Sequence, residues 1–314
     1  MDKVQQADEV VINLPAAVPQ ASAGIRSRWQ GFELLATLPI VTPLLFSTAW
    51  PRWIVMWLLC GWIFAGCKWL TWRRSSIAEA TWARQLGYLF AWPGLDADRF
   101  LKPTLASIQQ PLLREWLFAA GKLLLGLVLF FFVARLVPAD APLVRGWIGM
   151  IGIVFSLHFG SFHLLSCAWR CVGVDAPPLM DWPVLATSLS DFWGRRWNEA
   201  FRDLTHPFLF RPLLPRWGAA GALFAVFGLS GLIHELAITL PAGGGYGGPI
   251  CYFLLQACGL LIERSAAGKA LDLARGWRGW LFSLLLLVVP VGLLLPPVFV
   301  REIIVPMMQA IGAI

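Results

Sequence analysis

The sequence predicts an all-α membrane protein that crosses the bilayer about seven to nine times, with further amphipathic helices at the membrane surface. Three observations support this fold class. Of the 314 residues, 58% are hydrophobic and only 14% are charged, whereas soluble domains carry roughly 25% charged residues. The mean hydropathy is +0.68. The 18 Trp residues are typical of polytopic chains, whose aromatic rings anchor at the membrane interfaces.

Apolar stretches long enough to approach the roughly 20 residues of a membrane-crossing helix recur along the chain. They lie at residues 31–50, 52–71, 116–137, 143–171, 217–240, 247–263 and 279–298. Residues 302–314 are apolar but short, and they are predicted to form a partial eighth element. Residues 79–92 are predicted to lie in the interface or to re-enter the membrane.

The N-terminal residues 1–28 are polar, rich in Ala and Pro, and have no apolar run. They are predicted to form a mobile cytoplasmic tail rather than a cleavable signal peptide. Residues 29–314 are predicted to form one integral membrane domain.

The distribution of Lys and Arg predicts the orientation. With the N-terminus in the cytoplasm, the cytoplasmic tail and loops hold 18 of the 25 basic residues, as the positive-inside rule expects. The net charge of +7 is therefore attributed to loops and not to binding of nucleic acid. The membrane is expected to be a bacterial inner membrane or the endoplasmic reticulum.

The cysteine pattern indicates neither a zinc knuckle nor a disulfide framework. All six Cys lie inside or at the ends of apolar stretches, and no CxxC spacing occurs. His163, Cys167 and Cys171 share one helical face, but buried small side chains are the ordinary interpretation of that spacing. No metal is predicted.

The first of two polar segments, residues 190–198, reads SDFWGRRWN. A helix is predicted to begin near Ser188 or Ser190, either of which is a good N-cap. Its tryptophans fall on one side and its polar residues on the other, which is typical of an amphipathic helix at the cytoplasmic interface. A basic surface helix that binds lipid headgroups is one interpretation of this pattern.

Two features of the first polar segment favour a functional role instead. Asn198 shares a strip with Asp191, so its amide is expected to be held by that carboxylate. The pair Arg195 and Arg196 suits phosphates, including those of a nucleotide-bearing thioester such as coenzyme A.

The second polar segment, residues 227–235, reads FGLSGLIHE and places His234 beside Glu235 inside an apolar stretch. Ionisable residues at membrane depth are costly and usually mark a functional site. Ser230 and Gly231, one turn below the histidine, leave room for a partner helix or a ligand chain. Glu235 points about 100° away from His234, so it is expected to bind a neighbouring helix. The alternative is a helix-packing site with a structural histidine.

The other histidines are weaker candidates. His158 and His163 lie in the 143–171 stretch and are candidates to line the same cavity as His234. His206 precedes Pro207 in a predicted loop, where it is expected to be solvated.

The motifs that are absent narrow the chemistry. The sequence has no GxSxG, no P-loop, no GxGxxG after a strand and no cluster of three or more His with metal spacing. What remains is His234 as a general base and Asn198 as a neutral polar group. That pair suits transfer of an acyl group from an activated donor to a hydroxyl, in which the base contributes about 10²–10⁴-fold and an amide donor stabilises the carbonyl oxygen. No covalent enzyme intermediate is required.

At these residues the sequence resembles the membrane-bound O-acyltransferase superfamily, and within it the wax synthase branch. Residues 188–198, SLSDFWGRRWN, are similar to that branch's SLxDFWGRRWN signature. Residues 227–235 match its FxxSGLxHE stretch, and residues 252–263, which end in Glu263, also resemble the family. The likeness covers about residues 145–265.

This resemblance implies an acyl-CoA-dependent O-acyltransferase with His234 as the catalytic base and Asn198 as its partner. It implies a fold around a tunnel, which acyl-CoA reaches from the cytoplasmic side and a lipid-soluble alcohol from the bilayer. Acyl-CoA is a co-substrate, and no cofactor is expected. The residues expected to bind acyl-CoA are Trp193, Arg195, Arg196 and Trp197, and those expected to support the site are Asp191, Ser230 and Glu235.

Three alternatives stay open. The same chemistry could act on a sterol, a terpenoid or another hydroxyl instead of a long-chain alcohol. A transporter could use His234 and Glu235 as a proton relay, although no internal repeat of the transporter kind is evident. A structural lipid-binding scaffold would have no activity at all.

Overall fold

The computed structural model describes residues 29–47, 49–77, 79–103 and 108–314, and all regular secondary structure in these ranges is helical. The predicted mobile tail, residues 1–28, lies outside the described residues. The α-helices are α1 (Glu33–Ala36), α2 (Leu38–Phe46), α3 (Arg52–Arg74), α4 (Trp82–Ala91), α5 (Ala97–Leu101), α6 (Leu113–Val128), α7 (Ala134–Leu136), α8 (Pro142–Ile153), α9 (Phe162–Cys171), α10 (Leu189–Asp191), α11 (Glu199–Thr205), α12 (Arg211–His234), α13 (Leu240–Ala242), α14 (Gly248–Arg264), α15 (Ala266–Ala270), α16 (Gly276–Val288), α17 (Val291–Leu294), α18 (Pro297–Phe299) and α19 (Val305–Ala310).

Short π-helical segments join several of these helices into longer rods. They are η1 (Leu129–Val133), η2 (Val154–Ser161), η4 (Phe192–Arg196), η5 (His206–Phe210), η6 (Glu235–Thr239) and η7 (Val300–Ile304), and η3 (Pro183–Leu185) is a 3₁₀ turn. π-Helical segments are rare, and they occur frequently at functional sites.

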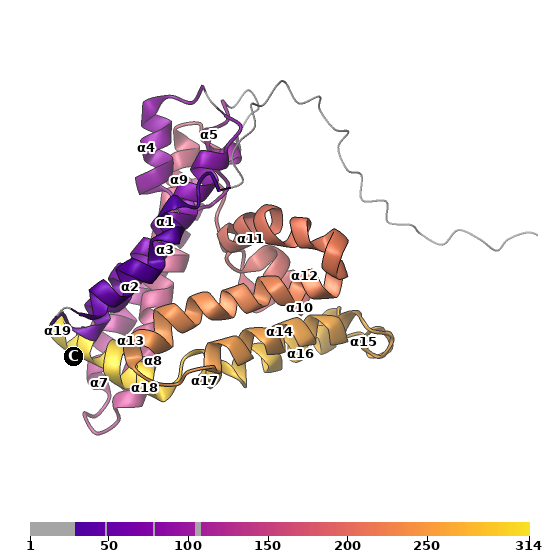
Figure 1. The fold of residues 1–314 in the computed structure, drawn as a ribbon. Coiled ribbons are helices and arrows are strands. Elements are labelled where there is room, and N and C mark those ends of the chain that lie inside the picture. Colours follow the sequence, from indigo (N-terminus) through magenta and orange to yellow (C-terminus); the bar gives the residue numbers. More distant parts are fainter. Residues whose placement is uncertain (1–28, 48, 78, 104–107) are drawn as a thin grey trace, which may run out of the picture.

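Within the described ranges, five helical segments are long and apolar enough to cross a membrane. They are Arg52–Arg74, Leu113–Leu136, Pro142–Cys171, Glu199–Ala242 and Gly276–Leu294. They correspond to five of the seven predicted spans. Figure 1 shows α12 and α14 running side by side.

Two predicted spans are not among these five segments. Residues 33–46 form two short helices, α1 and α2, that meet at Thr37, and α2 has only nine residues, with Pro39 in its first turn. Proline removes a backbone donor and crowds the preceding turn, so one long helix is disfavoured there. Residues 247–263 are helical as predicted, but α14 has 17 residues. The count of seven to nine crossings therefore stays a prediction.

The two weaker predicted elements are helical as well. Residues 79–92 contain α4, whose Trp82 and Phe90 are strongly exposed. This exposure agrees with a helix whose aromatic rings meet lipid or the interface. Residues 302–314 contain the end of η7 and all of α19, too short to cross a bilayer.

Close packing of α12 on α14 brings the second polar segment against a neighbouring helix. A Cβ atom at Gly231 would lie 2.7 Å from the Cα atom of Ile250. Only glycine permits so close an approach of the two backbones. The space for a partner helix that the sequence predicts is confirmed at this residue.

The first polar segment begins as predicted and is anchored by α14. The Ser188 Oγ accepts a hydrogen bond from the Asp191 amide at 2.9 Å, which confirms Ser188 as the N-cap. The buried Glu263 carboxylate accepts further hydrogen bonds from the amides of Leu189 at 2.6 Å and Ser190 at 3.3 Å. A carboxylate at a helix N-terminus satisfies otherwise unpaired donors. Glu263 thereby ties the segment to α14.

The prediction of one continuous amphipathic helix is wrong beyond Arg196. Trp197 is extended, and Asn198 has left-handed backbone angles, with φ 47° and ψ 60°. Asparagine tolerates this conformation better than most residues because its short side chain bonds locally. The chain turns at Asn198, and α11 starts in a new direction.

Candidate functional site

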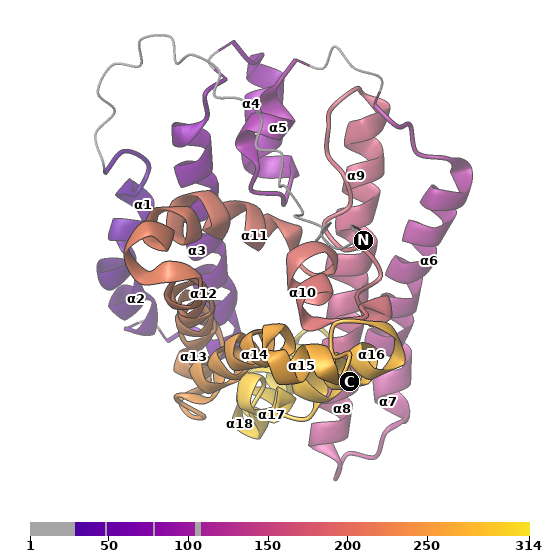
Figure 2. The ribbon, with the colours of Figure 1, turned by 90° about the vertical axis from the view of Figure 1, so that its right-hand side faces the viewer.

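The structure contains a cavity of about 440 Å³, and its lining includes both His234 and Asn198. Its walls come from α3, η2, η4, α11, α12 and α14. In Figure 2, α11 lies above α14, with α3 on one side and the α8–α9 rod on the other. The lining is mostly apolar, with a few polar side chains among it, which is the usual character of a ligand pocket.

His234 stands at the junction of α12 and η6, with one ring nitrogen occupied. Its Nδ1 lies 2.7 Å from the backbone carbonyl oxygen of Ser230. A carbonyl only accepts, so Nδ1 carries the proton and Nε2 keeps its lone pair. The Phe253 ring packs on the imidazole, with 4.6 Å between ring centroids. Nε2 has no hydrogen-bond partner among the described residues, so it is available as a base.

Asn198 reaches the cavity from the break between η4 and α11. Its Oδ1 accepts a hydrogen bond from the Phe201 amide at 3.3 Å, which caps α11. This cap leaves the Nδ2 group as the free part of the side chain in the described structure. Asn198 therefore presents a hydrogen-bond donor, while His234 presents an acceptor.

The expected contact between Asp191 and Asn198 is not formed. Asp191 instead binds Arg196 Nε at 2.6 Å and Arg195 Nη2 at 2.7 Å. Burial of Asp191 raises the pKa of its carboxyl, but the hydrogen bonds from Arg196 and Arg195 outweigh burial, and the net pKa is lowered. The break at Asn198 turns its side chain away from the helical strip on which the prediction depended.

The two arginines of the first polar segment differ in their surroundings. Arg196 is mostly buried and also donates to the backbone oxygen of Asp181 at 3.1 Å. The Arg195 side chain keeps 65% of its surface exposed. Arg196 therefore stabilises the segment through its bonds to Asp191 and Asp181, whereas the exposed Arg195 can bind a soluble ligand.

Both tryptophans of the first polar segment line the cavity. Trp193 packs edge-on against Phe227, with 5.5 Å between ring centroids, and Trp197 stacks on Phe192 at 5.7 Å. The fully buried Gln256 accepts a hydrogen bond from Trp193 Nε1 at 3.4 Å. These contacts fix two large aromatic walls beside Asn198.

Of the two supporting residues predicted on the second polar segment, Ser230 lines the cavity and Glu235 does not. Ser230 lines the cavity one turn from His234. Glu235 does not line it, because its Oε1 accepts hydrogen bonds from the Gly247 amide and the Thr239 hydroxyl, both at 2.7 Å. Glu235 therefore fastens the turn before α14 and bonds Thr239 of its own segment, so the predicted contact with a neighbouring helix is made only through the residue that precedes α14.

Of the two histidines in the 143–171 stretch, only His158 lines the cavity. His163 faces α6, where its Nε2 lies 3.0 Å from Glu115 Oε1 and its Nδ1 lies 2.7 Å from Lys122 Nζ. The prediction that both line one cavity is confirmed for His158 and wrong for His163.

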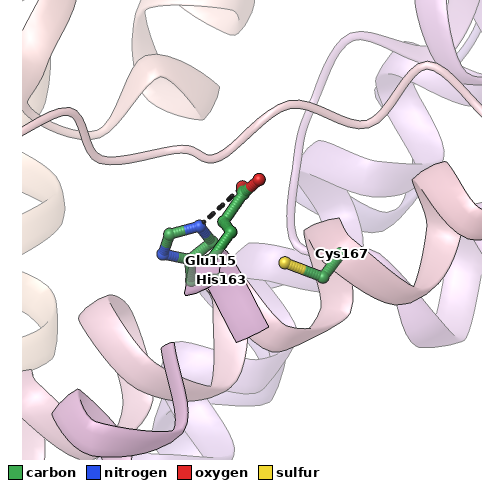
Figure 3. Close-up of side chains that lie close together, drawn as sticks. All are labelled: Glu115, His163 and Cys167. Carbon is green, nitrogen blue, oxygen red and sulfur yellow. Dashed lines mark hydrogen bonds and ion pairs between the residues drawn. The ribbon is translucent and has the colours of Figure 1, made fainter. Parts of the chain in front are cut away.

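Glu115, His163 and Cys167 form a compact group whose potential ligand atoms all lie within 4.8 Å of one another. Figure 3 shows the Glu115 carboxylate directed at the His163 ring, with Cys167 one turn along α9. Arg170 and Lys122 supply two positive charges to this group, where a metal ion would add another. An ionic clasp between α6 and α9 fits these charges better than a metal site. The exposed Cys171 is not part of it.

Some residues that shape the site were missed by sequence reasoning. Gln256 orients Trp193, Phe253 packs on His234, and Arg202 lines the cavity while bonding the Gly194 carbonyl at 2.7 Å. Gln256 and Glu263 lie seven residues apart on one face of an apolar helix, and that spacing was a usable signal. Arg202 lies on the predicted polar strip with Asp191 and Asn198, whereas no sequence pattern marked Phe253.

A comparison with protein families matches residues 176–255 to the membrane bound O-acyl transferase family. The matched range contains Asn198, His234 and most of the cavity wall from α11 to α14.

Similar proteins come from plants. The long-chain-alcohol O-fatty-acyltransferase of Simmondsia chinensis is 30% identical over 38% of this chain and 40% of its own length. The acyl-CoA–sterol O-acyltransferase 1 of Arabidopsis thaliana is 39% identical over 27% of each chain. The probable long-chain-alcohol O-fatty-acyltransferase 3 of the same plant is 26% identical over 55% of this chain and 52% of its own length. The matches thus span about half or less of each of these relatives. The segment 176–255 is thus similar to the membrane bound O-acyl transferase family, and the relatives it resembles include long-chain-alcohol and sterol O-acyltransferases.

Proposed function

We propose that this protein is an acyl-CoA-dependent O-acyltransferase that esterifies a hydrophobic alcohol, with His234 as the general base. One observation carries the proposal: His234 and Asn198, from two separate polar segments, line the same cavity. One presents a free acceptor nitrogen and the other a free amide donor. Acyl transfer to a hydroxyl needs both, at one place that excludes water.

In the proposed reaction, the hydroxyl oxygen bonds to the thioester carbonyl carbon while His234 Nε2 takes the hydroxyl proton. The carbonyl π electrons move to the oxygen, where Asn198 Nδ2 donates a hydrogen bond. The C=O bond then re-forms, the C–S bond breaks, and the sulfur takes the proton from His234. The products are an ester and free coenzyme A. No bond to the enzyme forms at any step.

The substrate arrangement follows from the surroundings of the first polar segment. The acyl chain is placed in the apolar cavity, against Trp193 and Trp197. The exposed Arg195 is assigned to the phosphates of coenzyme A, on the cytoplasmic side of the membrane. Arg196 does not contact the substrate in this proposal; its buried ion pair with Asp191 stabilises the first polar segment, which carries Trp193 and Trp197. A passage through the membrane that joins the two substrate entrances is part of the proposal.

Long-chain alcohols are the favoured acceptors because the Simmondsia chinensis relative, by its name, acts on them. A sterol is the second candidate, since one Arabidopsis thaliana relative is named for sterol acylation. A His–Glu proton relay has less support, because Glu235 bonds Gly247 and Thr239 and lies outside the cavity lining.

The proposal is tested with purified protein in lipid nanodiscs, radiolabelled palmitoyl-CoA and either hexadecanol, a sterol or no acceptor. We expect hexadecanol to give labelled ester and free coenzyme A in equal amounts. Ester formed only with the sterol would move the acceptor to the second candidate. If no acceptor gives ester while the protein stays folded, the acyltransferase proposal is wrong, and proton flux into proteoliposomes then tests the transporter alternative.

A further inference from the structure

The cavity contains a second histidine that the reaction above does not use. His158 lies in η2, the longest π-helical segment described, in the middle of the Pro142–Cys171 span. Its ring lines the cavity with His234 and Asn198, and Phe162 packs edge-on against it with 5.3 Å between ring centroids. Both cavity histidines thus stand at π-helical segments, where side chains are often re-aimed for function.

His158 makes no hydrogen bond in the described structure. Its Nδ1 is buried and has no partner. Its Nε2 is less completely buried than Nδ1, so Nε2 is the ring nitrogen with access to the cavity. Nearly all buried polar side chains in proteins make at least one hydrogen bond, so a histidine ring with neither nitrogen paired calls for a ligand or another reason.

The surroundings decide which nitrogen of neutral His158 carries the proton. A buried N–H without a partner is rarer and less favourable than a buried acceptor without one. The proton is therefore placed on Nε2, where a ligand oxygen in the cavity can accept it. His158 then differs from His234, whose bond to Ser230 puts the proton on Nδ1 and the lone pair toward the cavity.

The η2 segment touches the wall that carries Asn198. Phe159, next to His158, packs edge-on against Trp197 with 6.1 Å between ring centroids. Trp197 directly precedes Asn198 in the chain. His158 and Asn198 thus bring two hydrogen-bond donors to neighbouring walls of one cavity.

We infer that His158 Nε2–H is a second hydrogen-bond donor, with Asn198 Nδ2, to the carbonyl oxygen of the acyl donor. This inference rests on the proposed acyl transfer. His158 transfers no proton: it stabilises the negative charge on that oxygen after the hydroxyl attacks and releases it when the C–S bond breaks. Two donors aimed at one developing oxyanion are a common solution in acyl-transfer sites.

The kinetic test compares His158→Phe with His158→Gln, and His206→Phe serves as the matched control because His206 is exposed and outside the cavity. Loss of one such donor is expected to lower kcat by about 10²-fold. KM for acyl-CoA should change little, because the interaction is strongest in the transition state. His158→Gln keeps an N–H donor and should recover part of the loss. A folded His158→Phe protein with near-wild-type kcat would overturn the inference.

A binding test separates a hydrogen bond from a merely structural role. Two inert coenzyme A derivatives are compared: an S-(2-oxoalkyl) ketone, which keeps a carbonyl, and an S-alkyl thioether, which lacks it. Wild-type protein should bind the ketone more tightly, and His158→Phe should remove most of this preference without weakening thioether binding. An equal loss for both derivatives would show a structural role only and contradict the inference. If wild-type protein makes no ester at all, the proposed function fails, and the ketone preference still tests the hydrogen bond.

Discussion

Replacing His234 with alanine is expected to lower kcat for ester formation by about 10²–10⁴-fold, the usual contribution of a general base. The physical reason is that Nε2 is the cavity atom that can take the hydroxyl proton, since Nδ1 is held by Ser230 at 2.7 Å. A neutral alcohol attacks a thioester slowly without such a base. The measurement is the steady-state rate of coenzyme A release with saturating acyl-CoA and hexadecanol.

The matched control for this experiment is His206→Ala, because His206 is exposed at the start of η5 and does not line the cavity. That variant should keep the wild-type rate. A His234→Gln protein tests shape, since glutamine fills similar space but is not a base. If folded His234→Ala turns over at nearly the wild-type rate, His234 is not the base and the proposed mechanism is wrong.

Replacing Asn198 with glycine is expected to lower kcat by about 10²–10³-fold, the usual effect of losing one donor to a developing oxyanion. Glycine is the informative replacement because it accepts the left-handed backbone at φ 47° without strain. Glycine in place of an asparagine N-cap weakens a helix by only a few tenths of a kcal/mol. The loss of rate is therefore assigned to the amide and not to the fold.

Asp272→Gly is the matched control, since Asp272 also has a left-handed backbone, with φ 54°, and is exposed outside the cavity. It should leave the rate unchanged. Asn198→Asp keeps the cap oxygen but loses the N–H donor and adds a charge, so it should be at least as slow as Asn198→Gly. An Asn198→Gly enzyme with an unchanged kcat would remove Asn198 from the reaction.

Much of the fold could be predicted because hydropathy and length decide which helices suit a membrane. The stretches 52–71, 116–137 and 143–171 are predominantly apolar, and each lies in a long helical segment. The prediction failed at residues 31–50, where hydropathy is high but the prolines divide the helix near Thr37. Hydropathy averages over such local backbone effects, and the turn chemistry has to be considered separately.

The candidate site could be predicted as a pair of residues but not as a geometry. Buried polarity in an apolar stretch pointed to His234, and the resemblance pointed to Asn198. The contact between Asp191 and Asn198 was predicted wrongly because helical periodicity was extended through Asn198, where the chain turns. Contacts between distant segments, such as Phe159 with Trp197, left no pattern in the sequence.

In the proposed mechanism, one cavity holds the reacting carbonyl between His234 and Asn198. The most direct measurement is an experimental structure of the protein with the inert S-(2-oxoalkyl) coenzyme A derivative bound. We expect the carbonyl oxygen within hydrogen-bond distance of Asn198 Nδ2, and the carbonyl carbon facing His234 Nε2 with room for a hydroxyl between them. A derivative bound with its carbonyl outside this cavity, and with His234 closed off from it, would contradict the proposed mechanism.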